Sequence, residues 1–336
     1  MVPRMMIRSF FHYTFVFLVL MGFLLAGVPV EASRPYYEEE DTAPQRRWYH
    51  LLRPAESDPT AQLQHANELR EAERYWRAQR QYRALARYWP SAQEAVQAQF
   101  SYARVQEERE KWTRAFDGYE RLLDEYAGLF AHEQVLERMF GIAEHVMERR
   151  RAQFLFFPGF HAPERALPLF ETIVEYGPHG EHAPEAQFQM GRIQEDLGRL
   201  DEAIFSYERV ETRYPRDPRA VEAAFAKGRS LYRMTRRHPN DLDGAETAYY
   251  TLALFVQNHP QSPDVEEARD YMDEIRGHMA KLEYKKARFY DRMANEPQAA
   301  LVVYRRFVER FPDSEWGSQA RKRIKELESH VEEPDV

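Results

Sequence analysis

The sequence of 336 residues contains no cysteine. This absence excludes disulfide bonds, thiol catalysis and cysteine-based zinc sites, and it also excludes an N-terminal cysteine to which a lipid could be attached. A folded domain of this chain must therefore be held together by the packing of its core.

Residues that form turns are also scarce, since 14 Gly and 20 Pro make up about a tenth of the chain. A β-sandwich or β-barrel needs turn residues at short intervals, so the composition argues against an all-β fold. The chain instead combines many helix-forming Ala, Glu, Gln and Arg residues with 21 Phe, 20 Tyr and 5 Trp. This composition predicts a helical protein whose helices pack through aromatic rings.

The sequence lacks the patterns of catalysis and nucleic-acid binding. Asp and Glu outnumber Lys and Arg by 55 to 47, and no basic stripe is evident, which argues against a nucleic-acid partner. No phosphate-binding glycine loop, serine-hydrolase elbow or zinc-protease motif occurs. We therefore expect no catalytic residues and no cofactor. The acidic pairs Glu107-Glu108 and Glu332-Glu333 and the run from Glu38 to Asp41 are predicted to lie on solvated faces or tails.

One histidine cluster has the spacing of a metal site. His179 and His182 stand three residues apart and could share a metal ion on a helix. Pro178, Gly180 and Pro184 indicate a turn at this place instead, and no third ligand can be assigned. We expect a solvated turn here and no metal.

The N-terminus has the features of an export signal. Arg4 and Arg8 precede an uncharged apolar run from Thr14 to Val30, and small residues occupy a cleavage site before Ser33. Residues 1–32 are therefore predicted to be a signal peptide, with an uncleaved anchor helix as the alternative. Residues 33–60 are acidic and interrupted by prolines, and we expect a flexible linker.

A repeated pattern occupies the body of the chain. It is aligned on breaks at Pro90, Ala127, Pro178, Pro215, Pro260 and Pro312, and it places a small residue 12 positions before each break and a large residue eight positions before it. These spacings put both residues on one face of a helix that ends at the break. The predicted packing residues are Ala78, Tyr82, Ala115, Tyr119, Ala166, Phe170, Ala203, Tyr207, Ala248, Leu252, Ala300 and Tyr304.

Small residues also recur five and eight positions after each proline, which predicts a second helix beyond the break. Two antiparallel helices that bury small and aromatic residues must stack on a neighbouring pair to cover their other faces. We expect an all-α fold, an α-solenoid of about six tetratricopeptide-like helix pairs over residues 61–328. An acidic tail, residues 329–336, follows.

A long insert, residues 129–163, interrupts the repeats. It begins with an amphipathic stretch and then carries the candidate docking segment. This segment consists of three arginines followed by a run of rings, and its Pro158-Gly159 step cannot continue a helix. One hypothesis is an exposed loop that docks a protein partner or the membrane interface; the alternative is that the rings fold back between neighbouring repeats. The candidate residues are Arg149, Arg150, Arg151, Phe154, Phe156, Phe157 and Phe160.

The C-terminal third resembles a known family. The phrases Phe255-x3-His259-Pro260-Gln261-Ser262-Pro263, Lys281-Leu282-Glu283-Tyr284 and Ala300-x3-Tyr304-x6-Phe311-Pro312-Asp313 are similar to those of the BamD (YfiO-type) outer-membrane assembly lipoproteins. The resemblance implies a periplasmic, non-enzymatic scaffold that takes part in the assembly and insertion of outer-membrane β-barrel proteins. The cysteine that carries the lipid in that family is missing here.

The resemblance also implies where the protein acts and with what. We expect an exported protein in the periplasm or on the periplasmic face of the outer membrane, with the β-barrel assembly machinery as its partner. Membrane association would run through partners or an uncleaved N-terminal anchor. The alternative is a periplasmic repeat adaptor of the CpoB/YbgF type, which coordinates envelope division or peptidoglycan machinery. The coiled-coil heptads expected before the repeats of such an adaptor are not visible.

Overall fold

The computed structural model describes residues 53–148, 150–154, 157–294 and 296–332, without the side chains of residues 150–161 and 330–332. The predicted signal peptide, most of the predicted linker, Arg149 and Phe156 lie outside the described residues. None of the described helices has the length and apolar character needed to cross a membrane.

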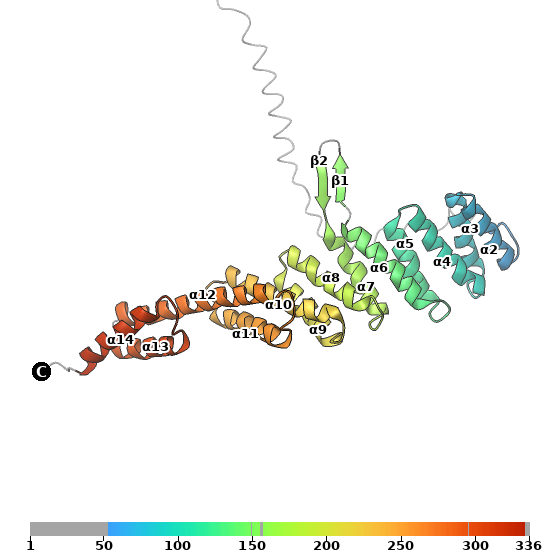
Figure 1. The fold of residues 1–336 in the computed structure, drawn as a ribbon. Helices are drawn as coiled ribbons and strands as arrows, with labels where there is room; N and C mark the ends of the chain where they lie inside the picture. The colour runs from blue at the N-terminus through green and yellow to red at the C-terminus, as the bar shows by residue number, and fades with distance from the viewer. Residues whose placement is uncertain (1–52, 149, 155–156, 295, 333–336) are drawn as a thin grey trace, which may run out of the picture. The chain divides into compact units, whose positions relative to one another are not determined.

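The described part of the chain is an all-α array of consecutive helices with one β-hairpin (Figure 1). Each helix packs against the helices before and after it in the sequence, as expected for an α-solenoid. The elements are α2 (Pro59–Glu71), α3 (Tyr75–Tyr88), α4 (Gln93–Glu108), α5 (Trp112–Glu125), α6 (His132–Glu148), β1 (Arg150–Phe154), β2 (Phe157–His161), the 3-10 helix η2 (Pro163–Ala166), α7 (Leu167–Tyr176), α8 (Ala183–Asp196), α9 (Leu200–Arg213), α10 (Pro218–Arg237), α11 (Leu242–Asn258), α12 (Val265–Arg292), α13 (Pro297–Arg310) and α14 (Gly317–Glu332).

The six predicted breaks fall at six turns between helices. Each of α3, α5, α7, α9, α11 and α13 ends two residues before its break residue. At all five proline breaks the turn is closed by a backbone hydrogen bond across it, for example from Ser262 N–H to His259 C=O at 3.0 Å. Proline fits the second position of such a turn because its ring fixes φ there.

The predicted packing residues form the core. All twelve are buried, and eleven of them lie on the helices that end at the breaks, which we call the ring helices; the twelfth, Ala166, ends η2 just before the ring helix α7. Small residues on neighbouring helices allow these side chains to approach closely. A Cβ atom added at Gly191 of α8 would lie 2.6 Å from the ring of Tyr207 on α9. Close packing of small residues against rings therefore sets the spacing between helices.

The structure corrects three predicted boundaries. The repeat array begins at Pro59, inside the predicted linker, because Asp58 caps α2 through a hydrogen bond to Ala61 N–H. The predicted insert 129–163 contains α6, a regular helix whose apolar face joins the main core, so only the hairpin interrupts the repeats. Finally, α14 continues to Glu332, into the predicted tail.

Candidate functional site

Polar groups connect neighbouring helices at three ring helices. At each of them a tyrosine hydroxyl donates a hydrogen bond to a carboxylate on the preceding helix, and an arginine on the following helix binds the same carboxylate. We call these three arrangements the tyrosine junctions. They consist of Tyr119 with Glu107 and Arg138, Tyr207 with Glu195 and Arg229, and Tyr304 with Asp291 and Arg323.

The junction at Tyr207 is the most buried of the three. Glu195 is only 3% exposed. It accepts hydrogen bonds from Tyr207 Oη at 2.9 Å and from two nitrogens of Arg229 at 2.9 and 2.8 Å, and Arg233 adds a contact of 3.1 Å. The bidentate guanidinium therefore satisfies the carboxylate away from water.

These contacts shift the pKa of the groups in the junctions. Burial alone would raise the pKa of Glu195, but the hydrogen bonds and charges of Arg229 and Arg233 outweigh it and lower the pKa. Burial, with Glu195 nearby, raises the pKa of Tyr207 well above its ordinary range. At Asp291 the hydrogen bonds from Arg323 lower the pKa. At neutral pH the carboxyl groups of Glu195 and Asp291 are therefore ionised and the hydroxyl of Tyr207 is protonated, as the hydrogen bonds of the junctions require.

Sequence inspection missed these residues. Glu107 was expected on a solvated face, but it is partly buried and bonded to Tyr119 Oη at 2.8 Å, because α5 and α6 pack over it. A signal for the junctions is present in the sequence, since each carboxylate stands 12 or 13 residues before its tyrosine. Where the ring helix carries Phe170 or Leu252, no carboxylate occupies those positions.

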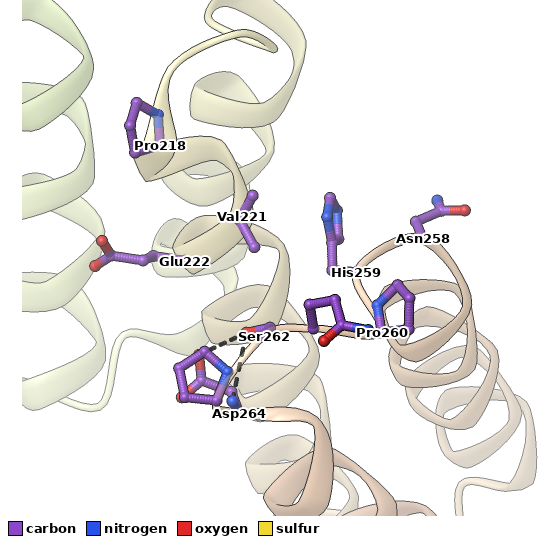
Figure 2. Close-up of a pocket in the computed structure, with 10 residues that line it drawn as sticks. Pro218, Val221, Glu222, Asn258, His259, Pro260, Ser262 and Asp264 are labelled. Carbon is purple, nitrogen blue, oxygen red and sulfur yellow. Dashed lines mark hydrogen bonds between the residues drawn. The ribbon is translucent and has the colours of Figure 1, made fainter.

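A cavity lies where the α11–α12 turn meets the start of α10. Its volume is about 760 Å³, and Figure 2 shows the turn residues on one side and the first turn of α10 on the other. The lining residues are Pro218, Val221, Glu222, Asn258, His259, Pro260, Gln261, Ser262, Pro263 and Asp264.

The shape of this turn follows from its sequence. The helix α11 ends at Asn258 because Pro260 cannot continue it. Ser262 Oγ donates a hydrogen bond to Asp264 Oδ2 at 3.2 Å and accepts one from Asp264 N–H at 3.3 Å (Figure 2). The ring of His259 packs on Phe255, 5.6 Å between centroids.

The lining of the cavity offers groups that can bind a ligand. Asn258 and Gln261 offer amide groups, His259 offers an imidazole, and Val221 with the prolines supplies apolar surface. Amides beside apolar surface can pair with the backbone of an extended protein segment.

The candidate docking segment forms a β-hairpin. β1 and β2 pair antiparallel between α6 and η2, with Phe154 opposite Phe157, Arg151 opposite Phe160 and Arg150 opposite His161 (Figure 1). The helix α6 ends at Glu148, so the aromatic run does not continue it. Arg149 and Phe156 lie outside the described residues, as do the side chains of the strands, so the docking role remains a prediction.

The histidine cluster lies in a turn between α7 and α8. His182 stacks on Phe140 of α6, with 4.9 Å between ring centroids. Among the described residues no group of three potential metal ligands comes together. His182 is therefore occupied in packing, whereas His179 is exposed.

Two family models match the chain. Residues 164–302 match the YfiO family, described as an outer membrane lipoprotein, and residues 63–129 match a tetratricopeptide repeat. The chain carries a YfiO-type region within a tetratricopeptide array. This YfiO-type region begins in η2 and ends within α13, so it covers the cavity and starts earlier in the sequence than the resemblance noted above. The two families are protein-interaction scaffolds, and protein–protein interaction is what the repeats imply.

Solved structures with tetratricopeptide repeats are also similar. YrrB, a protein with an unusual peptide-binding site, is 20% identical over 63% of this chain and 92% of its own, with a TM-score of 0.31. A tetratricopeptide repeat protein from Parabacteroides merdae is 12% identical over 80% and 98% of the two chains, with a TM-score of 0.31. MamA from Desulfovibrio magneticus is 12% identical over 62% and 98%, with a TM-score of 0.30. No match is found among the curated proteins.

Proposed function

We propose that this protein is a periplasmic scaffold that takes part in the assembly and insertion of outer-membrane β-barrel proteins. The observation that carries the proposal is the match of residues 164–302 to a family of outer membrane lipoproteins, on an array of helices built for protein contacts. The apolar run from Thr14 to Val30 supports export.

Two surfaces are proposed to bind the assembly machinery. One is the cavity at the α11–α12 turn, because it lies inside the YfiO-type region and presents amides beside prolines. The other is the candidate docking segment, because its arginines and rings are contiguous in sequence and are not among the repeat packing positions.

The scaffold role is tested by identifying the companions of the tagged full chain after mild cross-linking and solubilisation of the envelope. Recovery of a large outer-membrane barrel protein with polypeptide-transport repeats is expected. Recovery of Tol, Pal or peptidoglycan synthases in its place would overturn the proposal and favour the adaptor of the CpoB/YbgF type.

The cavity is tested with His259→Ala combined with Gln261→Ala. Both residues line the cavity, and their loss is expected to reduce companion recovery about tenfold, since a few interface residues carry most of the binding energy. The matched control is Asp313→Ala with Glu315→Ala in the equivalent α13–α14 turn. Equal recovery of the two variants would show that the cavity is not the binding surface.

The docking segment is tested with Phe156→Ser combined with Phe157→Ser. Loss of companions at unchanged thermal stability is expected if the rings dock a partner. Unchanged recovery with a lower melting temperature would show that the rings fill space between repeats.

A further inference from the structure

The C-terminal half of α12 carries a cationic face whose residues are not among the packing positions of the repeated pattern. α12 spans 28 residues and is the longest of the described helices. Residues 276–325 contain 13 Lys and Arg against six Asp and Glu, in a chain whose net charge is −8. Five of the seven lysines of the whole chain fall in this stretch.

Folding sorts the charges of this helix half between two sides. The acidic residues point inward: Glu283 is 7% exposed, and the side chain of Asp291 is 4% exposed and bound to Arg323. Ala280 and Ala287 are buried on the same side. No acidic side chain therefore remains on the outward side between Lys281 and Met293.

The outward side consists of two adjacent stripes, which together we call the α12 face. Lys281, Lys285, Arg288 and Arg292 follow one another at steps of four, three and four residues, which places them in one line along the helix. The neighbouring line holds Lys286, Phe289 and Met293. The seven residues are all exposed, Phe289 by 55% and Met293 by 77%.

We propose that the α12 face binds the surface of an anionic lipid bilayer. Five cations with no anion among them select a negatively charged partner, and each basic side chain near an anionic membrane adds to the attraction. Phe289 and Met293 lie in the second stripe with Lys286, next to the four cations of the first stripe. Apolar residues are placed beside cations in this way on helices that lie in a membrane interface. Lysine and arginine stems can reach headgroups while those two side chains enter the acyl boundary.

A lipid surface fits this face better than an acidic protein does. The face is the convex side of a single helix, whereas protein segments are usually bound in grooves between helices. The sequence had indicated no basic stripe, because Glu283 and Asp291 interrupt the cations along the chain. The interruption disappears when α11, α13 and α14 cover the acidic side.

The test is co-sedimentation of the full chain with vesicles of phosphatidylcholine containing 30% phosphatidylglycerol. The full chain is expected to bind these vesicles more tightly than vesicles of pure phosphatidylcholine, and the difference should decrease as NaCl screens the charges. The pure phosphatidylcholine baseline accounts for the N-terminal apolar run, which every variant retains.

Replacing Lys281, Lys285 and Lys286 by Gln is expected to weaken binding to the anionic vesicles by roughly tenfold or more. The matched control replaces three exposed arginines elsewhere, Arg74, Arg83 and Arg216, and should bind like the unaltered chain. Phe289→Ser combined with Met293→Ser should remove the part of the binding that resists salt. All changed side chains are exposed, and unaltered melting temperatures confirm that the variants are folded.

Two results would overturn the proposal. One is equal binding of the triple lysine variant and the arginine control. The other is binding of the α12 face to a soluble poly-glutamate peptide without binding to the anionic vesicles, which would identify an acidic protein as the occupant.

Discussion

Five of the described ring helices pack in two ways on the same register, whereas on the sixth, α3, the Tyr82 hydroxyl donates a hydrogen bond to Asn67 Oδ1 at 2.7 Å. At Tyr119, Tyr207 and Tyr304 the ring ends in a hydroxyl that is bound to a buried carboxylate and, through it, to an arginine of the next helix. Phe170 and Leu252 occupy the same position in other repeats and make apolar contacts there. The rings of Phe140 and Phe170 are 5.8 Å apart between centroids, and Leu252 packs against Gly228. We call the latter the apolar junctions.

The difference shows what each kind of junction determines. An apolar junction gains from burial, which is not directional, so neighbouring helices can adjust to each other. A tyrosine junction connects three helices through hydrogen bonds with fixed geometry, and a missing member leaves buried polar groups without partners. We infer that the tyrosine junctions fix the orientation between repeats, whereas the apolar junctions mainly supply stability.

The largest effect is expected from Glu195→Ala. This change leaves the Tyr207 hydroxyl and the guanidinium of Arg229 without their shared partner, and breaking a buried pair in this way costs about 3–5 kcal/mol. The free energy of unfolding from urea denaturation measures it. The control is Glu202→Ala, whose ion pair with Arg199 is exposed and should change stability by less than about 0.5 kcal/mol.

Replacing by alanine the glycine that faces Tyr207 or Leu252 should further distinguish the two kinds of junction. In Gly191→Ala the new methyl would meet the ring of Tyr207, which Glu195 holds in place, and we expect a loss of about 2–3 kcal/mol. In Gly228→Ala it would meet the end of Leu252, which can change rotamer, so the loss should be about 1 kcal/mol.

Gly277→Ala on the exposed side of α12 is the reference for these two variants. No atom lies within 4 Å of the added methyl, and the change should stabilise the helix by about 0.5–1 kcal/mol. Equal losses at Gly191 and Gly228 in thermal unfolding would show that the tyrosine is no more rigid than the leucine.

Exchanging the rings tests the hydroxyl itself. Tyr207→Phe removes one donor from Glu195, while Arg229 remains, so we expect a loss of about 1–2 kcal/mol. Phe170→Tyr buries a hydroxyl beside Phe140, where no carboxylate stands 12 or 13 residues earlier in the sequence, and it should also destabilise by about 1–2 kcal/mol. A neutral outcome in both exchanges, in the same denaturation assay, would contradict the distinction between the junctions.

The smallest expected effect is the change with pH in the contribution of Glu195 to the free energy of unfolding. The pKa of Glu195 is lowered in the folded state from its ordinary 4.5, so its contribution to stability is present above pH 4.5 and is lost as the pH falls through the folded pKa. The difference in unfolding free energy between the unaltered chain and Glu195→Gln should therefore shrink on acidification from pH 7. A difference that stays constant down to pH 3 would show that the carboxylate is not stabilised by its charge.

Much of the fold could be predicted because the repeats act locally. A proline that follows a helical run ends the helix, and a small residue four positions before a ring lies on the same helical face. The packing residues from Ala78 to Tyr304 are buried for this reason. The YfiO resemblance was likewise visible in the turn from His259 to Pro263, which lines the cavity.

Other features depend on which helices meet. The carboxylates of the junctions look like ordinary surface residues, and only the arginines from the next repeat, such as Arg138 for Glu107, show their role. The helix α6 was assigned to an insert, although its apolar face is part of the core.

The sequence by itself determined the helices, their ends and the side chains that fill the core, because those depend on spacing within one or two turns of the chain. Only the tertiary structure decided which charges are buried and which are exposed. In α12 the same helix half carries Glu283, Asp291 and five cations, and the helices packed against one side leave the cations alone on the other. The cost of burying a charge depends on its partners, and the arginine partners come from the next repeat, 31 to 34 residues later in the sequence.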